Sequence, residues 1–292
     1  MLFRRRRALT GPQAAALGRV LRAPTFELIP LRNALNQAAL LPAGSTVSVT
    51  ASPAKGIEAT VALCEQLQAR GFRAVPHVSA RMIRDRAHLA DLIAWLEGAG
   101  VDRAFIVGGD AKVPGTYPDG LSLLREMAEI GHPLGEIGIP GYPQGHPFIA
   151  DGPLLEALRA KAEFATYVTT QLCFDPAAIG RWIEARRAEG MTLPVHLGVP
   201  GVADPQKLLA IAARIGVADT HRFLLKNVRF VTRLVRSGGF YRPDGLLEGV
   251  APHLADSAAG IADLHVYTFN SVEATESWRR AFLDQLQVPI AF

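Results

Sequence analysis

Short apolar runs alternate with amphipathic stretches along almost the whole of this 292-residue chain. The runs are nearly continuous in apolar residues, which is typical of parallel strands covered on both faces rather than of strands with one wet face. About eight such runs are present, at 25–30, 46–51, 73–79, 103–109, 136–142, 167–174, 194–200 and 264–270. Eight strand-and-helix units in one chain favour a (β/α)8 barrel over an open sheet.

The stretches between the runs carry apolar residues at helical spacing, and several end at glycine, a common helix stop. They predict helices at 57–71, 88–100, 121–131, 154–165 and 176–190. The connection between the seventh and eighth runs is long and predicts extra helices, at 205–217 and near 221–236. We therefore predict one barrel domain over residues 1–292, in which 1–22 form an N-terminal extension and a helix.

The composition narrows the class of protein. The chain is 49% hydrophobic and 20% charged, so it can bury a large core. Its net charge of +4 is too small to indicate a nucleic-acid partner, and much of it lies in the run Arg4 to Arg7. No apolar run approaches a membrane span or forms a signal peptide. The two cysteines, Cys64 and Cys173, form no CxxC motif, which favours a reduced, cytoplasmic protein with small-molecule substrates. A homo-oligomer is left open.

In barrel enzymes the active site lies at the carboxyl ends of the strands. The first run, Phe26-Glu27-Leu28-Ile29-Pro30, places a carboxylate where burial is costly unless the group is paired or stays protonated. From this run alone, a strand-end glutamate reaching solvent is as good an interpretation as a functional acid. The other ends carry polar and aromatic residues: Thr50, His77, Ser79, Asp110, Tyr142, His146, Thr170, Gln171, Phe174, Asp175, Tyr267, Thr268 and Asn270.

Several chemistries have no support in the sequence. The histidines are scattered without metal-ligand spacing, so no metal site is predicted. His196 and His265 lie inside strand patterns and are interpreted as core residues. There is no GxSxG or P-loop motif. The sequence Gly108-Gly109-Asp110 is too short for a dinucleotide fingerprint, and its glycines are better interpreted as letting a ligand approach the backbone closely.

The ordered set FELIP, SVTA, PHVS, GGD, GYPQGHP, VTTQLCFD and HVYTFN, from about Phe26 to Asn270, resembles the methylenetetrahydrofolate reductase family. Its most specific parts are the Phe-Glu of the first run, Tyr-Pro-x-x-His-Pro at 142–147 and Thr-Gln-x-x-Phe-Asp at 170–175. That family is a flavin-carrying (β/α)8 barrel. The resemblance implies reduction of 5,10-methylenetetrahydrofolate to 5-methyltetrahydrofolate, with NADH or NADPH as hydride donor and FAD as bound cofactor.

The resemblance also implies residue roles. Glu27 matches the general acid, and Asp110 matches the aspartate between flavin and pterin; these two form the catalytic set. The implied cofactor contacts are Thr50, His77, Gly109, Asp110, Tyr142, His146 and Lys161, the last matching only if one residue is deleted before Gln171. The implied substrate contacts are Glu27, Asp110, Gln171, Phe174 and Asn270.

The chain departs from the family pattern mainly where the adenosine half of FAD would bind. Gly108 stands where the family has an arginine, and Leu154 and Ala157 stand at positions of polar contacts. Other departures are Lys207, Ile211 and Ser271. Three alternatives therefore stay open: a flavin-independent reductase with direct hydride transfer from NAD(P)H, a tetrahydrofolate-dependent methyltransferase or demethylase on a similar barrel, and a non-catalytic barrel that keeps a ligand pocket.

Overall fold

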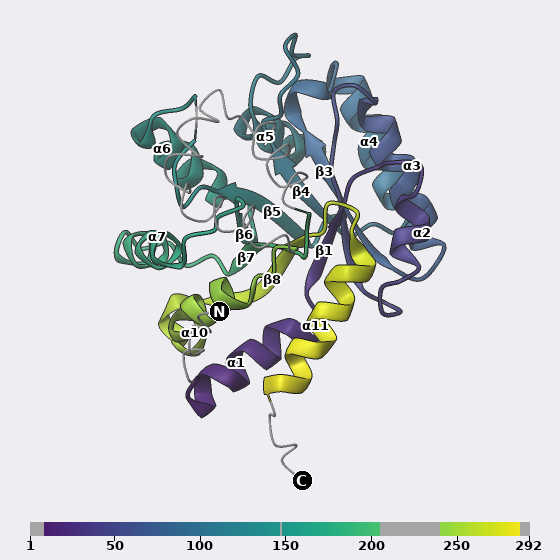
Figure 1. The fold of residues 1–292 in the computed structure, drawn as a ribbon. Coiled ribbons are helices and arrows are strands. Elements are labelled where there is room, and N and C mark those ends of the chain that lie inside the picture. Colours follow the sequence, from purple (N-terminus) through teal and green to yellow (C-terminus); the bar gives the residue numbers. More distant parts are fainter. Residues whose placement is uncertain (1–8, 147, 205–239, 287–292) are drawn as a thin grey trace.

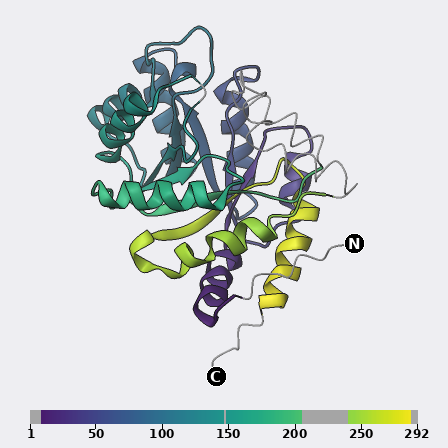
Figure 2. The ribbon, with the colours of Figure 1, turned by 60° about the vertical axis from the view of Figure 1, so that its left-hand side comes forward.

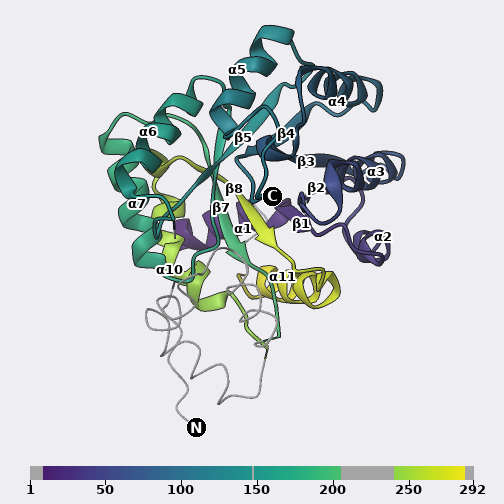
Figure 3. The same cartoon turned by 90° about the horizontal axis from the view of Figure 1, so that it is seen from above.

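Eight parallel strands close into a barrel in chain order, in a computed structural model that describes residues 9–146, 148–204 and 240–286 (Figure 1). The strands are β1 (Thr25–Leu28), β2 (Thr46–Val49), β3 (Arg73–Ser79), β4 (Arg103–Val107), β5 (Glu136–Gly141), β6 (Tyr167–Thr170), β7 (Val195–Pro200) and β8 (Ile261–Tyr267). Seen from above, they stand at the centre with helices around them (Figure 3). The predicted (β/α)8 barrel is confirmed.

The helices that surround the barrel follow the strands in turn. They are α1 (Gly11–Arg22), α2 (Ala34–Ala38), α3 (Gly56–Gln68), α4 (Arg86–Gly98), α5 (Gly120–Ile130), α6 (Asp151–Ala162), α7 (Pro176–Ala188), α10 (Asp244–Ala255) and α11 (Val272–Leu286). Two of these helices have strong N-terminal caps. Asp119 forms a capping box with Ser122 before α5, and Asp175 caps α7, which has Pro176 in its first turn. Helices α7 and α10 pack side by side (Figure 2).

Side chains along each strand point alternately toward the surrounding helices and into the barrel lumen. Phe26 and Leu28 are fully buried in the main core between strands and helices. Glu27 points the other way, into the barrel, because successive side chains of a strand face opposite sides. Closure pairs β1 with β8, with Thr25 opposite His265 and Glu27 opposite Tyr267. The barrel lumen is thereby lined by residues of the first and last strands together.

Helices α1 and α11 lie beside one another at the foot of the barrel (Figure 1). Arg19 of α1 donates to the carbonyl oxygens of Ile261 and Ala262, at the amino end of β8. Arg279 of α11 donates to the carbonyl of Leu21 at 2.6 Å. The predicted helix at 11–22 is thus present, and it packs at the end of the barrel opposite to the strand ends that carry the candidate site.

Some predicted boundaries are wrong. The eighth strand was predicted at 264–270, but β8 ends at Tyr267 because Phe269 and Asn270 adopt positive φ angles of 52° and 54°. The sixth ends at Thr170, since the chain then turns into the cap of α7. Helix α10 is the helix described between β7 and β8. The helices predicted at 205–217 and 221–236 lie outside the described residues, as does Arg4 to Arg7.

None of the helices in the described part of the chain is long and apolar enough to cross a membrane. The organisation of residues 1–292 as one domain stays a prediction, because part of the long connection after β7 is not described.

Candidate active site

Glu27 lies inside the barrel against two histidines from distant parts of the chain. Its Oε2 atom is 3.1 Å from Nε2 of His265 on β8 and 3.8 Å from Nε2 of His77 on β3. The Nε2 atom of His77 also lies 2.6 Å from Oγ of Ser48 on β2. All four side chains are largely buried, and that of Glu27 retains 13% exposure. This carboxylate is therefore held by partners and does not project into solvent as a strand-end glutamate would.

Burial decides the charge state of His77. Its pKa is lowered to about 4 by desolvation, which outweighs the opposing attraction of Glu27. His77 is therefore neutral near pH 7, and its approach to Glu27 is not an ion pair there. The hydrogen bond with Ser48 is the main polar contact of this imidazole.

Glu27, His77 and His265 are residue types that commonly bind metal ions, so their cluster is a possible metal site. One donor atom from each of Glu27, His77 and His265 lies within 4.8 Å of the others. Zinc ligands sit about 2.0–2.2 Å from the ion, so the cluster would have to tighten. As it stands, Glu27 is already bonded to His265, and His77 to Ser48. The sequence had suggested no metal-ligand spacing, because the three residues come from three separate strands.

Electrostatic interactions link Glu27 to the strand ends across the barrel. Burial, together with Glu27 and then Tyr142, raises the pKa of Tyr267. Burial and Asp110 in turn raise the pKa of Tyr142 to about 12. Burial also lowers the pKa of His146, against the opposing effect of Asp110. Tyr267 thus interacts electrostatically with Glu27 and Tyr142, and Tyr142 with Asp110.

The backbone at Gly109 is required for the end of β4. Its φ angle is 89°, and an added Cβ would collide with Oγ of Ser79 and lie 2.9 Å from Cβ of Ser79. Arg81 then holds the following loop through its Nε atom, which donates to the carbonyl of Ala111 at 2.7 Å. Asp110 stands exposed at the start of this loop. The side chain that approaches Gly109 closely is that of Ser79, and the approach of a ligand to this backbone stays a prediction.

Lys161 of α6 reaches toward the end of β4. Its Cδ atom would be 3.7 Å from a Cβ placed on Gly120, the first residue of α5. Burial lowers the pKa of this lysine, and Asp119 opposes the shift. A cation beside the amino end of a helix is an arrangement that suits a phosphate group.

The remaining predicted residues have defined places. Gln171 is half-buried, and its Oε1 accepts from the Leu172 amide. The Thr50 amide donates to the carbonyl of Leu28. Phe174 packs edge-on against Tyr241, with ring centroids 5.4 Å apart. Asn270 uses both polar side-chain atoms on Ile29: its Oδ1 accepts from the amide at 2.8 Å and its Nδ2 donates to the carbonyl at 2.9 Å.

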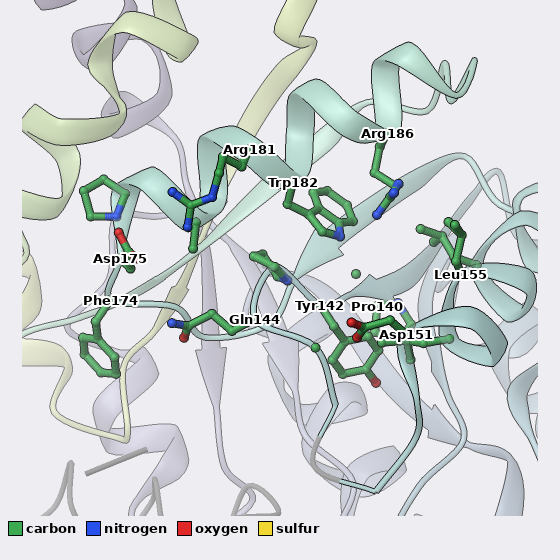
Figure 4. Close-up of a pocket in the computed structure, with 17 residues that line it drawn as sticks. Pro140, Tyr142, Gln144, Asp151, Leu155, Phe174, Asp175, Arg181, Trp182 and Arg186 are labelled. Atoms are coloured by element: carbon green, nitrogen blue, oxygen red, sulfur yellow. The ribbon is translucent and has the colours of Figure 1, made fainter. Parts of the chain in front are cut away.

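A pocket of about 730 Å³ opens between α6, α7 and the loop after β5. Tyr142 and Phe174 line it, and so do Leu154, Arg181 and Trp182 (Figure 4). Tyr142, whose pKa Asp110 helps to raise, is shared by the pocket and the candidate site, whereas Glu27, His77 and His265 do not line the pocket. The pocket gives room for a flat or apolar part of a ligand beside the strand ends.

Comparison with protein-family models shows to which family this chain belongs. The family model described as methylenetetrahydrofolate reductase matches residues 30–280, most of the chain. This chain belongs to the methylenetetrahydrofolate reductase family. The resemblance read from the motifs is confirmed, and membership makes the protein an oxidoreductase of folate metabolism. The match begins three residues after Glu27, so the role of that residue rests on the geometry above.

Solved structures add two distant likenesses. A putative phosphonomutase from Burkholderia cenocepacia is 18% identical, with a TM-score of 0.40 over 78% of this chain and 99% of that one. A dihydropteroate synthase from Coxiella burnetii in complex with pteroic acid is 11% identical, with a TM-score of 0.43 over 91% of this chain and 94% of that one. Neither likeness carries an argument about this member of the methylenetetrahydrofolate reductase family.

Members of this reductase family generally use FAD, and the residues present fit one part of it better than the other. Lys161 and the amino end of α5 suit phosphates, whereas the side of Gly109 where a Cβ would stand is filled by Ser79. Leu154 lines the pocket, where it offers no polar contact to a ligand. Lys207 and Ile211 lie outside the described residues.

Sequence reasoning missed two members of the reductase site. His265 was interpreted as a core residue; it is buried, yet it contacts the carboxylate of Glu27. Ser48, which bonds His77, was not singled out at all. The only sequence signal was strand alternation: Ser48 is two residues from Thr50 and His265 two residues from Tyr267, so each faces the same side as a residue already chosen. His196, by contrast, stacks on Tyr167 at 4.1 Å, as a core residue would.

Proposed function

We propose that this protein reduces 5,10-methylenetetrahydrofolate to 5-methyltetrahydrofolate, with NADH or NADPH as hydride donor, FAD as intermediate carrier and Glu27 as general acid. The observation that carries the proposal is the placement of Glu27. It is a largely buried carboxylic side chain at the lumen of the barrel, held through Oε2, with a link through Tyr267 and Tyr142 to Asp110. Family membership supplies the reaction class.

The proton chemistry follows from the substrate. Opening of the five-membered ring breaks the bond between the methylene carbon and N10, and N10 takes the proton from Glu27. The methylene carbon is left as an iminium on N5, and the hydride that arrives there makes the methyl group. One hydride and one proton are consumed for each methyl group formed. A general acid at this step contributes typically about 10²- to 10⁴-fold to the rate.

Bound FAD would supply the hydride-transfer chemistry between nicotinamide and folate. Lys161 and the amino end of α5 would hold its phosphates, and Thr50, His77, Gly109, Tyr142 and His146 are the proposed contacts of the remainder. Asp110 would set the electrostatic field beside the reacting rings. Gln171, Phe174 and Asn270 are proposed to orient the folate. The protein's own work is therefore positioning and proton control.

The test of the general acid compares two half-reactions in Glu27→Gln. Nucleotide oxidation by an artificial acceptor is expected to continue near the wild-type rate, while folate reduction falls by at least about 10²-fold. Glu97→Gln is the matched control, because Glu97 is an exposed residue in the last turn of α4. If Glu27→Gln reduces folate as fast as Glu97→Gln, the acid is misassigned.

The cofactor is tested by the absorption spectrum of the purified protein and by an anaerobic assay with each nucleotide. Bound flavin gives a yellow protein whose colour bleaches with NADH or NADPH and returns when 5,10-methylenetetrahydrofolate is added. The flavin-independent reductase is favoured by Gly108 and Leu154, which stand where the family has an arginine and a polar contact. It predicts a colourless protein that reduces the folate without added FAD. A folate-dependent methyltransferase predicts folate binding without nucleotide oxidation.

A further inference from the structure

We propose that His265 is a positioning residue for the acid: its Nε2–H donates to Oε2 of Glu27, so that the transferable proton is carried on Oε1. This inference rests on the proposed function of Glu27 as a proton donor. It assigns a role to a histidine of β8 whose place in a strand pattern otherwise suggests simple packing.

The backbone fixes the distance between the two groups. Thr268 donates from Oγ1 to the carbonyl of Glu27 at 2.6 Å, directly after β8. Asn270 then clamps the amide and carbonyl of Ile29. His265 itself is 4% exposed. The pairing of β1 with β8 therefore holds the backbones of His265 and Glu27 in place, and their side chains lie 3.1 Å apart.

The hydrogen bond serves both protonation states of the acid. When Glu27 carries its proton on Oε1, Oε2 is a carbonyl oxygen and accepts from His265. When the proton has left, Oε2 is a carboxylate oxygen and accepts more strongly. An interaction that strengthens as charge develops lowers the barrier to proton transfer. His265 neither gains nor loses a proton in this step.

His77 has a different part, although it also faces Glu27. Its Nε2 is engaged by Ser48 at 2.6 Å and lies 3.8 Å from Glu27, too far for a good hydrogen bond. The groups that face Glu27 are thus His77 from β3 and His265 with Tyr267 from β8, while β2 presents the uncharged Ser48. Of these, His265 is the one at hydrogen-bonding distance from the carboxylate.

The test uses two substitutions of His265. His265→Phe removes the donor, and His265→Gln keeps an N–H in a group that does not titrate. His265→Phe is expected to lower folate reduction about 10- to 100-fold, the range of a hydrogen bond to a charged group. The limb of the pH–rate profile that reports loss of the acid proton should move to higher pH, because a donor to the carboxylate is gone. His265→Gln should recover most of the rate.

Nucleotide oxidation by an artificial acceptor should stay within about twofold of wild type in both variants, a range too small to count as a lost charged hydrogen bond. His196→Gln is the matched control, since this half-buried histidine of β7 stacks on Tyr167. The inference is overturned if folate reduction falls equally in His196→Gln and His265→Phe, or if the pH limb does not move. The inference is also overturned if the wild-type protein binds one metal ion per molecule and His265→Phe binds none.

A readout independent of activity separates the two proposals. The carboxyl signal that disappears in Glu27→Gln can be followed by isotope-edited infrared titration. In His265→Phe this carboxyl should titrate at higher pH than in wild type. A shifted titration in a protein that does not reduce folate rejects the proposed function and keeps the positioning role. An unshifted titration rejects the positioning role whatever the enzyme does.

Discussion

Asn270 offers the sharpest stability experiment, because its structural contacts compete with the substrate role implied by the family. Its side chain is buried and makes two hydrogen bonds to Ile29, at 2.8 and 2.9 Å, just beyond the paired ends of β1 and β8. Its backbone also adopts a φ of 54°, which asparagine tolerates better than most residues. Substitution therefore removes two separable contributions.

The magnitudes follow from these contacts. Each hydrogen bond contributes about 1 kcal/mol, so losing both costs about 2 kcal/mol. Alanine adds about 1 kcal/mol for the left-handed backbone, whereas glycine does not. We expect Asn270→Ala to lower the free energy of unfolding by about 3 kcal/mol and Asn270→Gly by about 2 kcal/mol. Asn36→Ala, on the exposed face of α2, is expected to change it by less than about 0.5 kcal/mol.

The assay is urea unfolding followed by circular dichroism, combined with the KM for the folate. The clamp explanation is refuted if both variants of Asn270 unfold with wild-type free energy. If stability is unchanged while the KM rises, the side chain is a substrate contact, as the resemblance implies. If the alanine and glycine variants are equally unstable, the positive φ contributes nothing measurable.

Two further predictions concern stability. Burial lowers the pKa of His77 and of His196 to about 4 from a usual value of 6.5, so the unfolded chain binds more protons than the folded one between these limits, and stability falls as pH drops from about 6.5 to 4. Asp263, whose pKa burial raises to about 6, opposes this over part of the range, but one carboxyl does not balance two histidines. The urea midpoint should thus decrease from pH 7 to pH 4.5, and less so in His196→Gln; a rising midpoint would contradict the assignment. Gly109→Ala should cost about 2–3 kcal/mol, from the φ of 89° and the collision with Ser79, whereas Gly44→Ala, with a φ of 72° and open space, should cost about 1 kcal/mol. Equal losses in these two glycine variants would show that Ser79 gives way freely.

Much of the fold could be predicted from local patterns. The third strand was predicted at its observed bounds, and the seventh within one residue, because continuous apolar runs with clear flanks mark buried parallel strands. The eighth was placed three residues too late. Its apolar run continues through Phe269, and only the hydrogen bonds from Thr268 and Asn270 to β1 show where pairing ends.

The candidate site divides in the same way. Glu27 could be chosen from sequence, since a carboxylate in a buried run needs an explanation. Its partner His265 could not, because a histidine in a strand fits core packing equally well. Lys161 was matched only with a gap; it lies beside the start of α5, and its contact with a phosphate stays a prediction. Asn270 was chosen as a substrate contact, which stays a prediction; its side chain makes two hydrogen bonds with the backbone of Ile29.

The sequence by itself determined the order of the elements and the family. These follow from local periodicity and from short motifs, in which every residue is a near neighbour of the next. Tertiary structure alone decided which lumen residues touch. Glu27 and His265 are 238 positions apart in the chain and lie 3.1 Å apart in space. Their contact depends on the register at which β8 closes against β1, and that register is set by the packing of the whole barrel, which no local stretch of sequence encodes.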